Sequence, residues 1–175
     1  MNGGALPVGA DYIMGMGPGW KIAGAGDFNS DGKADLFWRN DSTGNTVVWL
    51  MDGITYKDAV WLAPNEPEWR LAAVTDIGAD GIPDLVWQSR TSGAIMIWAM
   101  NGGSMSVATS YCPNRGMDWK IVGTGDYNAD GMPDFLWHNS MTGEVSVWLM
   151  NGWSLNSEIS LGTVSDLNWK IGGEE

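Results

Sequence analysis

The stretch GDFNSDGKADLFW at residues 26–38 decides the fold, because it joins a polar loop to the start of an apolar strand. The loop has the form D-x-N-x-D-G-x-x-D. Side chains that carry oxygen atoms occupy its positions 1, 3, 5 and 9, which are Asp27, Asn29, Asp31 and Asp35. Gly32 follows the third of them and permits the tight curl that would bring these oxygens together.

The sequence around this loop repeats with a period of about 50 residues. WKIAGAGDFNSDG begins at Trp20, WRLAAVTDIGADG at Trp69 and WKIVGTGDYNADG at Trp119, and a fourth copy starts with WKIGG at Trp169 and stops. Such self-similarity indicates a repeat architecture. We therefore divide a single domain over 1–175 into three repeats and two partial units: 20–68, 69–118, 119–168, 1–19 and 169–175.

Turn signals divide each repeat into four short strands. In the first repeat, the aspartate loop is followed by DLFW, an STG turn at 42–44, NTVVWLM and a DG pair at 52–53. This pair and the NG pairs at 101–102 and 151–152 predict type I′ hairpins, which need positive φ at both central residues. Four-stranded antiparallel units of this length predict an all-β fold, a β-propeller of which the chain supplies about 3.5 blades.

The oxygen-rich loops predict a hard cation. Calcium takes about six to eight oxygen ligands in tolerant geometry, and the loop contains neither the sulfur nor the imidazole that zinc prefers. An EF-hand is excluded, because the last acidic residue comes at position 9 rather than 12 and strands flank the loop. The alternative is a plain turn, since turns favour Asp, Asn and Gly. That preference does not explain four oxygen positions at regular spacing in two loops out of three.

The three loops, GDFNSDGKADLFW, TDIGADGIPDLVW and GDYNADGMPDFLW, resemble the FG-GAP or VCBS repeat, the blade unit of integrin α-subunit propellers and of many secreted bacterial propellers. The resemblance covers practically the whole chain. It implies one Ca²⁺ in each complete loop, two to three per chain. The implied ligands, with the position-7 residues contributing backbone carbonyls, are Asp27, Asn29, Asp31, Lys33 and Asp35; Asp76, Asp80, Ile82 and Asp84; and Asp126, Asn128, Asp130, Met132 and Asp134.

The middle loop departs from the family pattern, because Gly78 stands where the family has Asn or Asp. This removes one ligand, so we expect the middle site to be weaker, to use a water molecule, or to be empty. Because the loops recur in every blade, their calcium is expected to stabilise the fold rather than to take part in chemistry.

Most of the 12 tryptophans recur at fixed positions in the repeats, which predicts core packing. Trp61 and Trp153 break the pattern, and Tyr111 stands at the position equivalent to Trp61. These three are the candidate ligand-binding residues, since exposed aromatic rings stack on sugars. The single histidine, His138, has no nucleophile or carboxylate partner fixed by a motif, and we expect no enzymatic activity.

The chain carries a net charge of −12, which argues against nucleic acid and anionic membrane surfaces as partners. It has no apolar run long enough to span a membrane. Residues 1–20 show neither a basic nor an apolar region, so we expect that they are not a signal peptide. We expect a non-enzymatic binding or adhesion module, and the resemblance implies an extracellular or cell-surface bacterial protein. The alternatives are a carbohydrate-binding propeller lectin and an accessory domain of a polysaccharide-active enzyme; the expected ligand is a glycan or a cell-surface protein.

Three complete blades are fewer than the four to eight of most propellers. Either the chain is a fragment of a longer one, or copies associate to close the ring. Open strand edges seek partners, so we expect a homo-oligomer, with a dimer as the simplest form.

Overall fold

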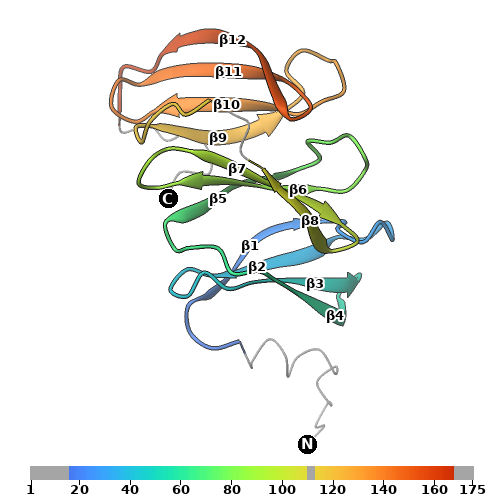
Figure 1. The fold of residues 1–175 in the computed structure, drawn as a ribbon. Helices are drawn as coiled ribbons and strands as arrows, with labels where there is room; N and C mark the ends of the chain where they lie inside the picture. Colours follow the sequence, from blue (N-terminus) through green and yellow to red (C-terminus); the bar gives the residue numbers. More distant parts are fainter. Residues whose placement is uncertain (1–15, 110–112, 168–175) are drawn as a thin grey trace, which may run out of the picture. The chain divides into compact units, whose positions relative to one another are not determined.

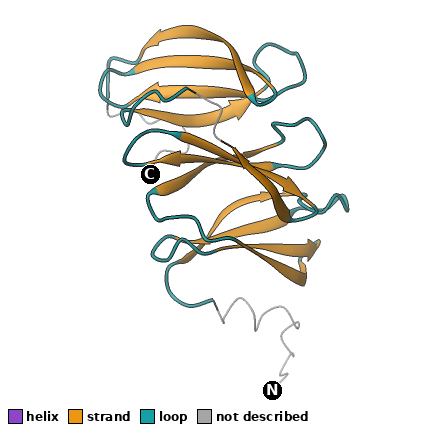
Figure 2. Ribbon diagram, in the orientation of Figure 1, coloured by secondary structure: helices purple, strands orange, loops and turns teal. Residues whose placement is uncertain are grey.

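The computed structural model describes residues 16–109 and 113–167. All regular secondary structure in these ranges is β-strand (Figure 2). The strands form three four-stranded antiparallel sheets, each with its strands in chain order (Figure 1). The strands are β1 (Trp20–Gly26), β2 (Asp35–Asn40), β3 (Thr46–Asp52), β4 (Thr55–Leu62), β5 (Trp69–Thr75), β6 (Asp84–Ser89), β7 (Ile95–Asn101), β8 (Ser104–Thr109), β9 (Trp119–Gly125), β10 (Asp134–Asn139), β11 (Glu144–Asn151) and β12 (Ser154–Thr163). The prediction of an all-β fold built from four-stranded blades of about 50 residues is confirmed.

The aspartate loop of each blade connects its first strand to its second. In the first blade the two strands meet directly at the ends of the loop, where Gly26 pairs with Asp35. The first strand also contains a β-bulge, between Ile22 and Gly24 in β1 and between Leu71 and Ala73 in β5. The last residue of the loop is therefore also the first residue of a buried strand.

The prediction of type I′ turns is wrong for two of the three hairpins between the third and fourth strands. Asp52 pairs with Thr55, so the central residues are Gly53 and Ile54, and among these only Gly53 has positive φ, at 64°. Gly152 and Trp153 form the equivalent turn, with positive φ only at Gly152, at 54°. This is the pattern of a type II′ turn, in which only the first central residue has positive φ. Ile54 and Trp153, which have bulky side chains, therefore stay out of the left-handed region of backbone conformation.

The hairpin of the second blade differs, because it has glycine at both central positions. Gly102 and Gly103 have φ of 59° and 84°, as a type I′ turn requires. The residue after the Asp-Gly or Asn-Gly pair thus decides the turn type.

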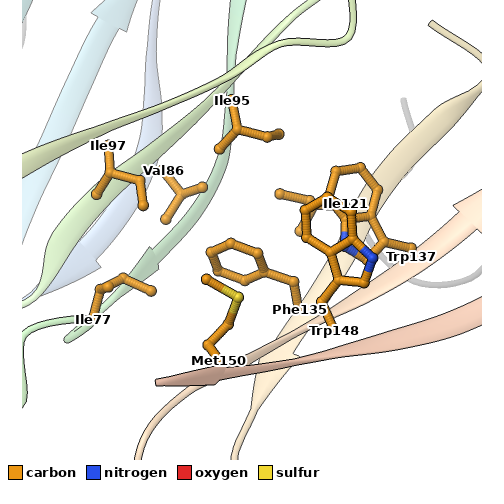
Figure 3. Close-up of a cluster of buried hydrophobic side chains, with 9 residues drawn as sticks. All are labelled: Ile77, Val86, Ile95, Ile97, Ile121, Phe135, Trp137, Trp148 and Met150. Atoms are coloured by element: carbon orange, nitrogen blue, oxygen red, sulfur yellow. The ribbon is translucent and has the colours of Figure 1, made fainter. Parts of the chain in front are cut away.

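Two compact units divide the chain: Met1–Pro67 with Asn101–Ser104, and Glu68–Met100 with Met105–Glu175. The core of the first unit contains Trp38, Val47, Trp49 and Met51, all buried. In the second unit, β5 and β9 lie side by side, and aliphatic side chains of β6, β7 and the loop before β6 face an aromatic group from β10 and β11 (Figure 3). The cluster consists of Ile77, Val86, Ile95, Ile97, Ile121, Phe135, Trp137, Trp148 and Met150.

The tryptophans of the second and third strands are buried, as their recurrence predicted. They form one tilted pair in each blade, with ring centroids 4.7 to 5.0 Å apart. The pairs are Trp38 with Trp49, Trp87 with Trp98, and Trp137 with Trp148. These rings provide the largest buried side chains in all three blades.

Several predicted features lie outside the described residues. They include Tyr111, Trp169 and most of the two partial units at 1–19 and 169–175. Among the described residues, no helix is long and apolar enough to cross a membrane.

Candidate functional site

The first aspartate loop gathers side-chain oxygens around its own backbone. The backbone N–H of Asp31 donates to Asp27 Oδ1 and to Asn29 Oδ1, each at 3.0 Å, so these two side chains converge on one atom. Asp27 Oδ2 also accepts from the N–H of Gly32 at 2.8 Å, and Asp31 Oδ1 accepts from the N–H of Lys33 at 2.9 Å. The residues at positions 1, 3 and 5 thus lie around a single turn.

The third loop has the same arrangement. The backbone N–H of Asp130 donates to Asp126 Oδ1 at 3.1 Å and to Asn128 Oδ1 at 2.9 Å. The N–H of Met132 donates to Asp130 Oδ1 at 2.8 Å. The backbone conformation matches as well, since Ser30 and Ala129, both at position 4, have φ of 60° and 61°. Equal spacing in the sequence therefore gives equal geometry in the fold.

The middle loop keeps this backbone but lacks one side chain. The N–H of Asp80 donates to Asp76 Oδ1 at 3.0 Å, the N–H of Ile82 donates to Asp80 Oδ1 at 2.9 Å, and Ala79 has φ of 53°. Gly78 provides no oxygen at position 3. The loop conformation therefore does not depend on the amide at that position.

The aspartate at position 9 points into the blade. Asp35, Asp84 and Asp134 are at most 2 % exposed. Asp35 Oδ2 accepts from the backbone N–H of Phe28 at 3.0 Å, and its Oδ1 accepts from the N–H of Met51 in β3 at 2.8 Å. Asp134 makes the same two bonds, with the N–H groups of Tyr127 and Met150. Each of these carboxylates ties its loop to the third strand of the same blade.

Burial has a direct effect on two of these carboxyl groups. It raises the pKa of Asp35 and of Asp84 above the ordinary value of 3.8, although the backbone N–H groups that donate to them act in the opposite direction. Sequence reasoning missed this second role, because the loop pattern shows four oxygen residues without showing that the fourth is inside the sheet.

A family model for the FG-GAP-like repeat matches residues 27–87 and 76–137. Both matches begin at the first aspartate of a loop, and together they span more than half of the chain. The chain belongs to the FG-GAP-like repeat family. The resemblance stated from the loop sequences is thereby confirmed, and the β-propeller blade is the unit of its fold.

A solved structure is similar to this FG-GAP-like chain in fold. It is described as the structure of the Photorhabdus luminescens Tc holotoxin pore, and it aligns with a TM-score of 0.58 at 16 % sequence identity. The match covers 91 % of this chain and 7 % of that chain, so this chain corresponds to a small part of the toxin protein. No curated protein sequence matches the chain.

The FG-GAP-like family implies calcium, and the outer two loops fit it by the chemistry of their donors. Each presents two carboxylates and one amide oxygen around one turn, all oxygen ligands of the kind calcium takes. Among the described residues, no group of three or more His, Cys, Asp and Glu side chains is gathered around a common point. In both outer loops the third carboxylate, at position 9, is bonded to backbone inside the blade.

The residues at position 7 are placed differently from one another. The ammonium group of Lys33 lies 2.6 Å from Asp52 Oδ1, outside the loop. The sulfur of Met132 accepts a 3.0 Å hydrogen bond from the N–H of Gly152. Only the backbone carbonyls of these residues were predicted as ligands, and their side chains leave the turn.

The two candidate ligand-binding tryptophans within the described residues have different surroundings. Trp61, on β4, is 62 % exposed and meets Trp20 edge to face, with ring centroids 5.7 Å apart. Trp153 is partly buried and packs against the core cluster of the second unit. Trp61 therefore presents a ring to solvent, whereas Trp153 belongs to the packing of a loop.

The polar residues that follow the second-strand tryptophans have a role that the sequence did not reveal. Arg39 and Gln88 are at most 2 % exposed. Arg39 Nη2 donates to the carbonyl of Glu66 at 3.2 Å, and Gln88 Nε2 donates to the carbonyl of Trp119 at 2.7 Å. Arg39 thus bonds near the end of its own repeat, whereas Gln88 bonds to the first residue of the following repeat.

Proposed function

We propose that this FG-GAP-like chain is a non-enzymatic binding module in which calcium ions brace the outer two aspartate loops. The observation that carries the proposal is the convergence of Asp27 and Asn29 on the amide of Asp31, and its repetition by Asp126 and Asn128 at Asp130. Two carboxylates and an amide in one turn leave negative charge that a cation would neutralise.

A structural role for the ions follows from their position in the repeat. The loops join the first two strands of each blade, and the position-9 aspartates tie them to the third strand. A cation bound by the loop would therefore stiffen three strands together. The buried position of His138, which is 2 % exposed, also supports a module without catalysis.

The charge of the loops indicates where such ions would be available. Calcium sites weaken as they lose charged ligands, and extracellular modules bind calcium with Kd of about 10⁻⁴ to 10⁻³ M. Only two carboxylates surround each outer turn, so we expect affinities in this weak range. Such sites fill outside cells, which supports an extracellular or cell-surface location.

Native mass spectrometry and thermal unfolding test the proposal directly. We expect two Ca²⁺ per chain and a Tm that rises with calcium concentration, since binding to the folded state alone stabilises it. D27N/D31N and D126N/D130N should each remove one ion, and D58N, which changes an exposed aspartate of β4, should remove none. A Tm that is the same in calcium and in EDTA would overturn the proposal.

A carbohydrate ligand is the second candidate function, and the exposed ring of Trp61 is the observation that favours it. An indole that is already held by an edge contact with Trp20 can stack on a sugar with little loss of side-chain freedom. Screening on a glycan array should then give binding that W61A abolishes and that D27N/D31N leaves intact. Turnover of any polysaccharide by the chain would instead indicate an enzyme.

We propose that copies of this chain associate into a homo-oligomer. The strand β12 lies at the edge of its sheet with nearly all of its side chains exposed, and edge strands pair readily with other strands. The similar fold in the Tc holotoxin pore comes from a protein that is part of an assembly, which agrees with this proposal. Light scattering should give a dimer or larger homo-oligomer, and a monomer at all concentrations would contradict it.

A further inference from the structure

The glycine at position 78 is not required by the backbone. Its φ lies outside the left-handed region, and the two residues of the middle loop that do adopt positive φ are Ala79 and Gly81, at 53° and 88°. Asn29 and Asn128 occupy the same position in the other loops, which have the same conformation. The reason for a glycine must therefore be sought in its surroundings.

The indole of Trp153 takes the space that a side chain at this position would need. A Cβ atom built at Gly78 would lie 3.3 Å from Cζ2 of Trp153, closer than most real Cβ contacts, whereas the next nearest atom, Cγ of Asp80, is 3.9 Å away. These two residues are far apart in the sequence, and the turn between β11 and β12 brings them together.

That turn is fixed on both sides. The N–H of Gly152 donates to the sulfur of Met132 in the third loop, at 3.0 Å. On the other side, a Cβ atom at Gly152 would lie 3.8 Å from the carbonyl oxygen of Ile77, in the middle loop. The ring of Trp153 itself packs against the buried cluster that contains Ile77. The indole is therefore held over the middle loop.

The first and second blades have no such ring at the equivalent position. There the corresponding residues are Ile54, which is 99 % exposed, and Gly103, which has no side chain. Within the part of the chain that the structure describes, the loop that lacks the position-3 side-chain oxygen contacts a tryptophan from the next blade. An indole edge has no oxygen lone pair to offer a hard cation.

From these contacts we infer that Trp153 takes the structural place of a cation in the middle loop, so that only the outer two loops of the chain bind calcium. The loop remains folded because Asp76 and Asp80 bond to its backbone and the indole covers the turn. The number of bound ions in this inference rests on the proposed calcium binding. The covering of the middle loop by the indole of Trp153, called the cap below, rests on packing alone.

Native mass spectrometry tests how many calcium ions the chain binds. D76N/D80N should leave two bound ions, and G78N/W153G, which restores the amide and removes the ring, should bind three. Three ions on the unmodified chain, or the loss of one in D76N/D80N, would overturn the inference.

Thermal unfolding in EDTA tests the cap without any metal. G78N alone should lower the Tm by about 3 °C or more, because its Cβ meets the indole, and the same substitution should have little effect in a W153L background. W153L should lower the Tm, whereas the matched change W61L, at an exposed ring, should not. Equal effects of G78N in both backgrounds would overturn the inference.

The ion count and the Tm values in EDTA distinguish a failure of the proposed calcium function from a failure of the proposed cap. If the unmodified chain binds no calcium, the proposed calcium function fails, and the EDTA measurements alone decide whether Trp153 caps the loop. If it binds two ions and G78N and W153L leave the Tm unchanged, the calcium function stands and the cap is wrong.

Discussion

Asp84 accepts a hydrogen bond of 3.0 Å from the backbone N–H of Met100, sixteen residues further along the chain. Its other oxygen accepts from the N–H of Ile77 at 3.0 Å, so one buried carboxylate joins the middle loop to β7. The same pair of bonds occurs at Asp35 and at Asp134. The position-9 aspartate is therefore part of the hydrogen bonding of the blade itself.

Replacing Asp84 by asparagine should destabilise the fold in the absence of calcium. Asn has the same shape but one carbonyl oxygen, so its NH₂ group would face one of the two backbone N–H donors and leave a buried donor unpaired. We expect a loss of about 1–3 kcal/mol at neutral pH, measured by urea unfolding in EDTA. The control D58N, at an exposed position, should stay within about 0.5 kcal/mol of the unmodified chain. An equal effect of both changes would contradict the buried bonding role.

The same residue predicts a pH dependence. Burial raises the pKa of Asp84 in the folded state, so the folded chain binds this proton more tightly than the unfolded chain does. The contribution of this carboxyl group to stability is therefore complete below its unfolded pKa of 3.8 and is lost as the pH rises through the folded value. D84N removes this group from the titration.

Urea unfolding of both chains in EDTA, from a pH of about 3 to about 6, measures this effect. The difference in unfolding free energy between the unmodified chain and D84N should narrow as the pH rises. A difference that widens over this range would mean that the folded pKa is lowered instead.

Gly143 should not tolerate any side chain. It lies in the turn between β10 and β11 with φ of 73°, and a Cβ atom there would be 2.1 Å from the carbonyl oxygen of Val164, whose N–H donates to the carbonyl of Gly143 at 2.8 Å. G143A should cost about 1–3 kcal/mol from the left-handed backbone alone, with the backbone clash in addition. The matched change G123A, in β9, meets only atoms at 3.8 Å or more and should cost about 1 kcal/mol or less. Urea midpoints of the two variants that coincide would contradict this account.

The fold could be predicted from the sequence because each blade repeats the same turn signals and the same tryptophans. The turn types could not be predicted from the Asp-Gly and Asn-Gly pairs alone. In all three hairpins the turn lies one residue later than these pairs. Where Ile54 or Trp153 is its second central residue, only the preceding glycine, Gly53 or Gly152, adopts positive φ. The pair Gly102–Gly103 has no such restriction.

The candidate site was predicted only in part, for a physical reason. The spacing of Asp27, Asn29 and Asp31 follows from the chain's own curl and is visible in the sequence. The bond from Asp35 to Met51 depends on the register of two strands, and the contact between Gly78 and Trp153 depends on the packing of two blades. Such contacts have no signature within the nine residues of a loop.

The segment that leads into the third repeat is anchored by Arg115, and its replacement gives the last prediction. The guanidinium carbon lies 3.6 Å from the ring centroid of Trp119, Nη1 donates to Ser146 Oγ at 2.6 Å, and Nη2 donates to Glu158 Oε1 at 2.6 Å. Lysine cannot keep the planar stacking and both bonds together, so R115K should cost about 1–3 kcal/mol.

The control E158Q separates the stacked guanidinium from its ion pair. The side chain of Glu158 is 44 % exposed, and an exposed ion pair contributes at most about 1 kcal/mol. Urea unfolding should therefore place E158Q close to the unmodified chain and R115K well below it. If the two variants lose the same stability, the ion pair rather than the stacking on Trp119 and the bond to Ser146 holds this segment, because only the ion pair is weakened in both.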